Sequence, residues 1–177
     1  ATAYGLTDAD RELKQKRVIP NGALALIMHT CEFSDGNQWA REITKEAIRV
    51  LGAQDYVGVL FFGGMGGYNW LTNGLEKVGG NKGALLAKVD NMDPGDMPDF
   101  DTTMGMAYQG LMKTNAAMRH IVIVSDGDAS PPAPSLMAQI KAAGITVSGI
   151  EIFPHGGSGR RHHDSIPFAA SQAVDRQ

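Results

Sequence analysis

Apolar residues in this chain fall into short continuous segments separated by stretches with helical spacing. Four segments are apolar nearly throughout and are bounded by turn-forming residues, which is typical of strands buried on both faces of a parallel sheet. They cover residues 23–28, 56–62, 121–124 and 145–152. Apolar residues at intervals of three and four predict helices over residues 38–51, 82–89, 102–114 and 134–143.

Some of these elements come with specific expectations for their side chains. The first helix is predicted to bury one face, made of Trp39, Ile43, Ala47, Val50 and Leu51. In the third, the candidate core contacts are Met106, Leu111 and Met112. The glycine-rich loop 63–67 predicts a turn into a short edge strand over residues 68–75. Two aromatic residues of that strand either anchor a protein partner or cover the sheet, namely Tyr68 and Trp70.

Strands that alternate with helices imply right-handed crossovers and a mostly parallel sheet with helices on both faces. We therefore expect an α/β, Rossmann-like, doubly wound fold. Residues 1–22 are predicted to be an N-terminal extension with a short helix, and residues 23–177 a single domain that ends in a helix over 166–174. Ligands of such folds bind beyond the carboxyl ends of the strands, so function is expected just after residues 28, 62, 124 and 152.

Composition narrows the function classes. The formal net charge of −3 argues against a general nucleic-acid binder, which is usually basic. The longest clean apolar run, residues 23–28, is too short to span a membrane. The single cysteine, Cys31, excludes a disulfide within the chain and leaves the compartment open.

Three segments resemble the von Willebrand factor A (vWA) family. Residues 23–33 (ALALIMHTCEF) resemble its first strand and loop, and residues 55–62 (DYVGVLFF) its second strand with the preceding aspartate. Residues 121–127 (IVIVSDG) are similar to its strand that ends in Ser-Asp-Gly. The resemblance covers about residues 20–175 and implies a vWA-like domain. It is closest to bacterial vWA domains in large membrane-anchored proteins that include a glutamine-amidotransferase-like region, so the parent protein is expected to be membrane-anchored.

The resemblance also implies a metal-ion-dependent adhesion site, whose residues this chain replaces. In the family, an Asp-x-Ser-x-Ser loop, a threonine from a second loop and an aspartate after the third motif hold a hard cation, which takes a carboxylate from a partner. Here the first-loop positions carry His29, Cys31 and Phe33, and Pro98 stands at the threonine. Only Asp126 matches a family ligand, so we expect a degenerate site without the usual metal.

Several alternatives remain open around this edge. Thr102 or Thr103 substitutes for the missing threonine if the loop is offset. A different metal site for Mg²⁺ or Ca²⁺ would use Asp126 and Asp128 with Asp99 and Asp101. These belong to a wider acidic set that otherwise forms a solvated rim, which would attract a basic partner: Asp90, Asp93, Asp96, Asp99, Asp101, Asp126 and Asp128.

Two further constellations are weighed against simpler interpretations. His29, Cys31 and Asp126 suggest a nucleophile, base and orienting carboxylate, but the first two lie close on one short segment, and a lone cysteine is more often a small buried apolar residue. Three histidines and an aspartate in the glycine-rich segment 155–164 offer zinc ligands, but its two arginines favour a solvated loop or a contact surface.

The sequence thus predicts a non-enzymatic protein-interaction or structural module. No cofactor is expected, and the partner is another protein or another region of the parent chain. The alternative is divalent-cation-dependent binding of a partner carboxylate through a rearranged site around Asp126.

Overall fold

A six-stranded sheet forms the centre of the fold in the computed structural model, which describes residues 20–29, 34–63, 66–92 and 95–152. The strands are β1 (Gly22–Met28), β2 (Tyr56–Phe62), β3 (Tyr68–Trp70), β4 (Glu76–Lys77), β5 (Met118–Ser125) and β6 (Thr146–Glu151). Their order is β3-β2-β1-β5-β6, and β4 also pairs with β2. Strands β2, β1, β5 and β6 are parallel, whereas β3 and β4 run antiparallel to β2.

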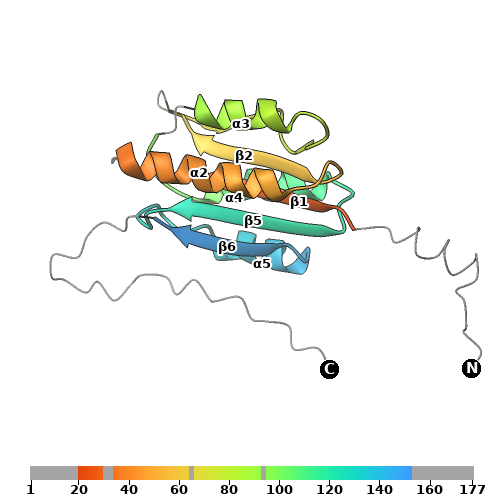
Figure 1. Cartoon of the computed structure of the whole chain (residues 1–177). Coiled ribbons are helices and arrows are strands. Elements are labelled where there is room, and N and C mark those ends of the chain that lie inside the picture. The colour runs from red at the N-terminus through yellow and green to blue at the C-terminus, as the bar shows by residue number, and fades with distance from the viewer. Residues whose placement is uncertain (1–19, 30–33, 64–65, 93–94, 153–177) are drawn as a thin grey trace, which may run out of the picture.

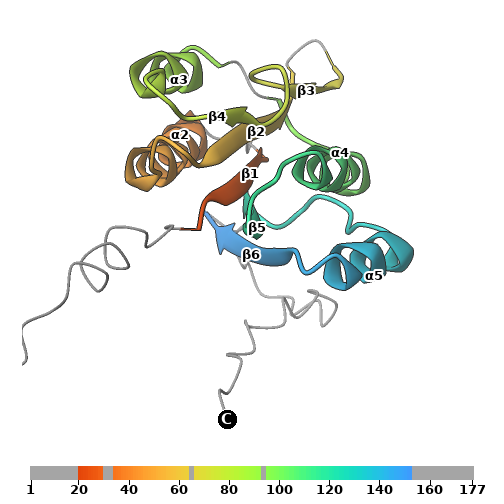
Figure 2. The same ribbon diagram turned by 90° about the vertical axis from the view of Figure 1, so that its right-hand side faces the viewer.

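Helices cover both faces of this sheet, as Figures 1 and 2 show. Helices α2 (Ser34–Val50) and α3 (Lys82–Asp90) pack on one face, and α4 (Asp101–Met112) and α5 (Pro134–Ala142) on the other. The predicted α/β, doubly wound, mostly parallel fold is therefore confirmed.

The central strand β1 explains why its sequence is continuously apolar. Successive side chains of a strand point to opposite faces of the sheet. Ala25 and Ile27 pack into the core beneath α4 and α5, while Leu26 and Met28 pack into the core beneath α2 and α3, all without exposed surface. Strand β5 divides its apolar side chains between the same two cores, as expected for strands covered on both faces.

The predicted buried face of α2 is wrong in part. Trp39 is 56% exposed and Val50 is 81% exposed, whereas the fully buried positions are Ala40, Thr44 and Ile48. The buried stripe still has helical spacing, but it is rotated from the predicted one. Helical spacing is compatible with neighbouring stripes, and packing of α2 on the sheet and on α3 selects one of them. Met112 of α4 is likewise exposed instead of buried.

Strand β6 was predicted to be buried on both faces and is mostly exposed. In the described part of the chain it pairs only with β5 and forms an edge of the sheet. Ile152, directly after the strand, is buried, and its backbone N–H donates to the Ser125 carbonyl. An apolar segment therefore identified the strand but not its place in the sheet.

The glycine-rich loop turns the chain from β2 into β3, as predicted. Gly66 and Gly67 have positive φ angles of 86° and 108°, a backbone conformation that L side chains rarely adopt. The Trp70 ring lies so close to Gly58 of β2 that an added Cβ there would be 2.5 Å from Trp70 Cζ3. Trp70 therefore covers the sheet, the second of the two roles considered for this aromatic pair.

The order of the strands creates a topological switch point, where the winding of the sheet reverses. From β1 the chain continues to β2 on one side, while β5 and β6 lie on the other side. Ligands of open α/β sheets bind at such a point, beyond the carboxyl ends of the strands.

Some predictions concern residues outside the described ranges. These are the helices expected over 8–16 and 166–174 and the loop of His155, His162, His163 and Asp164. The proposed division at residues 22 and 23 stays a prediction. Among the described helices, none combines the length and the hydropathy that crossing a membrane requires.

Candidate binding site at the carboxyl edge of the sheet

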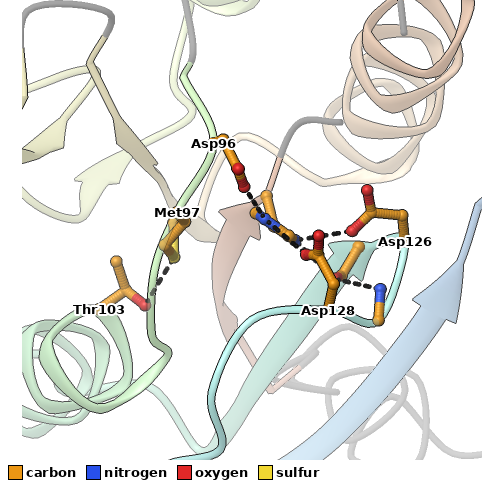
Figure 3. Close-up of polar contacts among 8 residues, drawn as sticks. Asp96, Met97, Thr103, Asp126 and Asp128 are labelled. Carbon is orange, nitrogen blue, oxygen red and sulfur yellow. Dashed lines mark hydrogen bonds and ion pairs between the residues drawn. The ribbon is translucent and has the colours of Figure 1, made fainter. Parts of the chain in front are cut away.

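Three separate segments bring polar side chains together at the carboxyl ends of β1 and β5. His29 follows β1 directly, Ser125 ends β5, and Asp126 and Asp128 follow in the next loop. The segment between α3 and α4 contributes Asp96. Figure 3 shows the carboxylates of Asp96, Asp126 and Asp128 converging at this point.

The His29 imidazole is the centre of this group and has no exposed surface. Its backbone N–H donates to the Val124 carbonyl at 2.9 Å, which extends the pairing of β1 with β5 by one residue. One edge of the ring meets the Phe100 ring, with centroids 5.8 Å apart and planes at 89°. The ring is therefore held by packing as well as by polar contacts.

Both ring nitrogens of His29 contact oxygen atoms. Nδ1 is 2.7 Å from Ser125 Oγ and 3.1 Å from Asp126 Oδ1. Nε2 is 2.8 Å from Asp96 Oδ1 and 3.3 Å from Asp128 Oδ1. An ionised carboxylate only accepts hydrogen bonds, so each such contact requires an N–H or a cation between the two atoms.

The two sides of the ring differ in exposure. The Asp126 side chain beside Nδ1 is 1% exposed, whereas those of Asp96 and Asp128 beside Nε2 are 55% and 46% exposed. Ser125 is buried, and its Oγ also accepts the Gly127 backbone N–H at 2.9 Å. The Nδ1 side of the ring therefore contacts buried side chains, and the Nε2 side faces the half-exposed carboxylates at the surface.

The carboxylates of this group repel one another. Burial raises the pKa of the Asp128 carboxyl above its ordinary value of 3.8. Repulsion by Asp126, a hydrogen bond with it and the charge of Asp96 raise this pKa further, while His29 lowers it. The Asp128 carboxyl is therefore easier to protonate than an ordinary exposed aspartate.

Comparison with known proteins bears on the fold of this chain. No family model and no curated protein sequence matches it. Among solved structures, it is similar to the conserved hypothetical protein BatB from Bacteroides thetaiotaomicron, with a TM-score of 0.57 and 13% identity over 74% of this chain and 66% of the other. A von Willebrand factor type A structure from Catenulispora acidiphila has a TM-score of 0.59 and 18% identity over 73% of this chain and 32% of the other.

The chain has the vWA fold. A further vWA-like neighbour is proximal thread matrix protein 1 from the mussel byssus with a zinc-occupied adhesion motif, with a TM-score of 0.58 and 15% identity over 75% of this chain and 38% of the other. The chain spans less than two thirds of the length of each of these proteins.

The vWA fold implies a hard divalent cation at this edge, and the His29 imidazole is not an oxygen ligand of the kind that such a cation prefers. Such a cation needs several oxygen ligands in an octahedral array. At the position of the first family aspartate stands the His29 imidazole, and Asp126, the single matching ligand, lies against Nδ1 of that ring. The other first-loop positions, Cys31 and Phe33, lie outside the described residues.

The second vWA loop supplies no replacement hydroxyl. Pro98 is exposed, and its carbonyl accepts the Ser130 N–H. Thr103 is fully buried in α4, where its Oγ1 contacts the Phe100 carbonyl at 3.3 Å and Met97 Sδ at 3.5 Å (Figure 3). Thr102 uses its backbone N–H to bond Asp99. These bonds of the two threonines lie within residues 97–103.

Two predicted metal ligands are engaged elsewhere. Asp99 accepts the hydroxyl of Tyr68, and burial together with this bond raises the pKa of Tyr68 to about 12. Asp101 accepts the backbone N–H of Ala133 ahead of α5 at 2.7 Å. Within the wider acidic set, Asp90 pairs with Lys45 at 2.7 Å. The hypothesis of a metal site formed by Asp99, Asp101, Asp126 and Asp128 stays a prediction, and two of these carboxylates already have partners on other elements.

Sequence reasoning missed two members of the site. Asp96 was placed only in a general acidic rim, yet it contacts His29 across 67 residues of sequence. Ser125 was seen only as part of the third motif, although its hydroxyl holds the His29 ring. The Ser-Asp-Gly motif identified where Ser125 lies, but nothing in the sequence paired it with a histidine on another strand.

Proposed function

We propose that this chain is a non-enzymatic, vWA-type protein-interaction module that binds through the edge formed by His29, Asp96 and Asp128. The observation that carries the proposal is the buried His29 ring at the position of the first family aspartate. It makes this edge unsuited to the hard cation and leaves two half-exposed carboxylates around a rigid centre. The usual adhesion-site metal is not required for this function.

The charge of the edge favours a basic partner. A partner carboxylate would meet Asp96 and Asp128 directly, and like charges brought together at an interface are unfavourable. A lysine or arginine side chain would meet complementary charge. The partner is a protein or another region of the parent chain, and membrane anchoring of that parent stays a prediction.

A hydrolase-like serine, histidine and aspartate also meet here, but their placement does not favour catalysis. Ser125 is 7% exposed, and its Oγ already accepts the Gly127 N–H. A nucleophile must reach a substrate carbonyl, and this hydroxyl lies on the internal side of the ring. A serine-directed fluorophosphonate probe is therefore expected to leave Ser125 unlabelled, and stoichiometric labelling would favour an enzyme.

Charge reversal tests the interaction surface. The immobilised chain and two variants, Asp128→Lys and Glu46→Lys, are exposed to proteins of the source cells in the presence of a chelator, and retained proteins are quantified by mass spectrometry. Glu46 is an exposed carboxylate on α2 that serves as the control. A set of basic proteins lost with Asp128→Lys and kept with Glu46→Lys supports the proposal. Identical retention by all three proteins contradicts it.

A further inference from the structure

We propose that His29 Nε2 and the carboxylates of Asp96 and Asp128 bind a divalent transition-metal ion of the Zn²⁺ class. This inference goes beyond the proposed function, which requires no metal. The set also differs from the family's all-oxygen site, because an imidazole supplies a ligand and Asp126 lies outside the set. It is the described group of histidine and acidic residues whose ligand atoms all lie within 4.8 Å of one another.

The distances suit a small ion. Nε2 is 2.8 Å from Asp96 Oδ1 and 3.3 Å from Asp128 Oδ1. In a tetrahedral zinc site with bonds of about 2.0–2.2 Å, neighbouring ligand atoms lie about 3.3–3.6 Å apart. Side-chain shifts of less than about 1 Å would therefore open the group around an ion, and the two aspartates are exposed enough to make them.

The contacts of Nδ1 favour a lone pair on Nε2 of the His29 ring. Asp126 beside Nδ1 is buried, and its Oδ1 lies 3.1 Å from this nitrogen, where it accepts a hydrogen bond when Nδ1 carries the proton. A proton held on Nδ1 leaves the lone pair of neutral imidazole on Nε2, which faces Asp96 and Asp128. Histidines that bind metals usually donate their other N–H to a carboxylate in this way. Ser125 Oγ, 2.7 Å from Nδ1, holds the ring in the same orientation.

Charge favours a dication over a proton at Nε2. Three carboxylates surround the ring, and a protonated imidazole offsets one negative charge, whereas a metal ion on the neutral ring offsets two. Metal binding would displace the proton that otherwise separates Nε2 from the carboxylate oxygens.

The ligand set also selects the kind of metal. Imidazole suits Zn²⁺ and similar transition metals, while Mg²⁺ and Ca²⁺ prefer oxygen ligands. Three protein ligands leave a fourth position open, and the exposed side of the group faces the surface. A bound ion would present this position to water or to a carboxylate of a partner, which would reverse the charge preference of the edge.

Calorimetric titration of the chelator-treated chain with Zn²⁺, Mn²⁺ and Mg²⁺ tests the proposal. We expect one Zn²⁺ per chain, bound at least about 100-fold more tightly than Mg²⁺. Loss of supporting residues around metal sites typically costs about 10–100-fold in affinity, so removal of a direct ligand in His29→Ala should cost at least about 100-fold. Asp128→Asn is expected to cost at least about 10-fold, and as a half-exposed substitution it keeps the test valid if His29→Ala does not fold.

Two controls separate this site from other histidines. His120→Ala removes a half-buried imidazole on β5 that contacts Thr146, and should leave Zn²⁺ affinity unchanged. The double variant His162→Ala/His163→Ala should also bind Zn²⁺ as the wild type does. Loss of binding in this double variant but not in Asp128→Asn would overturn the proposal.

Absence of Zn²⁺ binding by the folded wild-type chain would also overturn the proposal. The proposed interaction function would survive that result, because the capture experiment is performed with chelator present.

Discussion

Ser125 is the residue whose replacement best tests how the site is held together. In Ser125→Ala the His29 ring loses the contact of Nδ1 with Oγ at 2.7 Å, and the Gly127 N–H loses its acceptor at 2.9 Å. A hydrogen bond typically contributes about 0.5–1.5 kcal/mol net, and more when its loss leaves a buried group unsatisfied. Both losses are moderated here, because Gly127 is exposed to water and Asp126 Oδ1 lies 3.1 Å from the same ring nitrogen. We expect the free energy of unfolding to fall by about 1–2 kcal/mol.

His29→Ala should cost distinctly more. It removes the ring from its packing against Phe100 and removes the contacts of both nitrogens with carboxylates that then repel one another without compensation. Replacing a large buried ring by alanine typically costs about 3–5 kcal/mol, because it leaves a cavity. The Ser125→Ala/His29→Ala double variant should cost about 1 kcal/mol less than the sum, because the hydroxyl and the ring share one contact.

Urea unfolding followed by circular dichroism, with chelator present, measures all four proteins of this cycle. His120→Ala serves as the matched control, since its imidazole is only half-buried and should change stability by less than about 1 kcal/mol. Strict additivity of Ser125→Ala and His29→Ala would refute the reasoning. So would a Ser125→Ala variant as stable as the wild type.

Three further predictions concern the fold and the charge of the site. Gly58→Ala should destabilise the chain by about 1–3 kcal/mol, because the new Cβ would lie 2.5 Å from Trp70 Cζ3. Gly83→Ala in α3 has open space around it and should stabilise the chain by about 0.5–1 kcal/mol. The urea midpoints of the two variants measure this difference, and equal midpoints would contradict the packing argument. Asp55→Ala should cost about 2 kcal/mol, measured in the same way, because its carboxylate accepts the backbone N–H groups of Gly22 and Gly52. A carboxyl group whose pKa is raised by folding stabilises the fold at low pH, and this contribution is lost as the pH rises through the raised pKa. In chelator, Asp128→Asn should therefore gain stability relative to the wild type as the pH increases from 3.8. A stability difference that does not vary with pH would contradict this prediction.

The buried imidazole changes how this edge of a vWA fold is understood. The sequence predicts that the family's metal ligands are replaced by residues that do not hold a hard cation, and such a replacement by itself would suggest loss of metal-dependent binding. In the structure, the replacement residue is held on all sides by Ser125, Asp126, Asp96 and Asp128. Because His29 is fully buried and both its ring nitrogens contact oxygen atoms, the fold holds an imidazole at this edge in a defined orientation.

The sequence by itself determined the elements and the class of fold. Strands β1, β2 and β5 were recognisable because a central parallel strand must be apolar on both faces, and this leaves a continuous run that can be read locally. Helices α3 and α5 follow from spacing, and the bounds of α5 also follow from the proline at its start and the glycine after its end. The carboxyl edge of the sheet was expected to hold a binding site because ligands of mostly parallel sheets bind beyond the carboxyl ends of the strands.

Only the tertiary structure decided which polar side chains meet. His29 and Asp126 were both expected at the edge, but Asp96 arrives from a loop whose path no local pattern describes, while Asp99 and Asp101 turn away to Tyr68 and Ala133. The buried face of α2 and the edge position of β6 were decided in the same way. Local spacing records the period of a helix or strand, whereas the rotation of a helix, the neighbours of a strand and the meeting of distant loops depend on how whole elements pack.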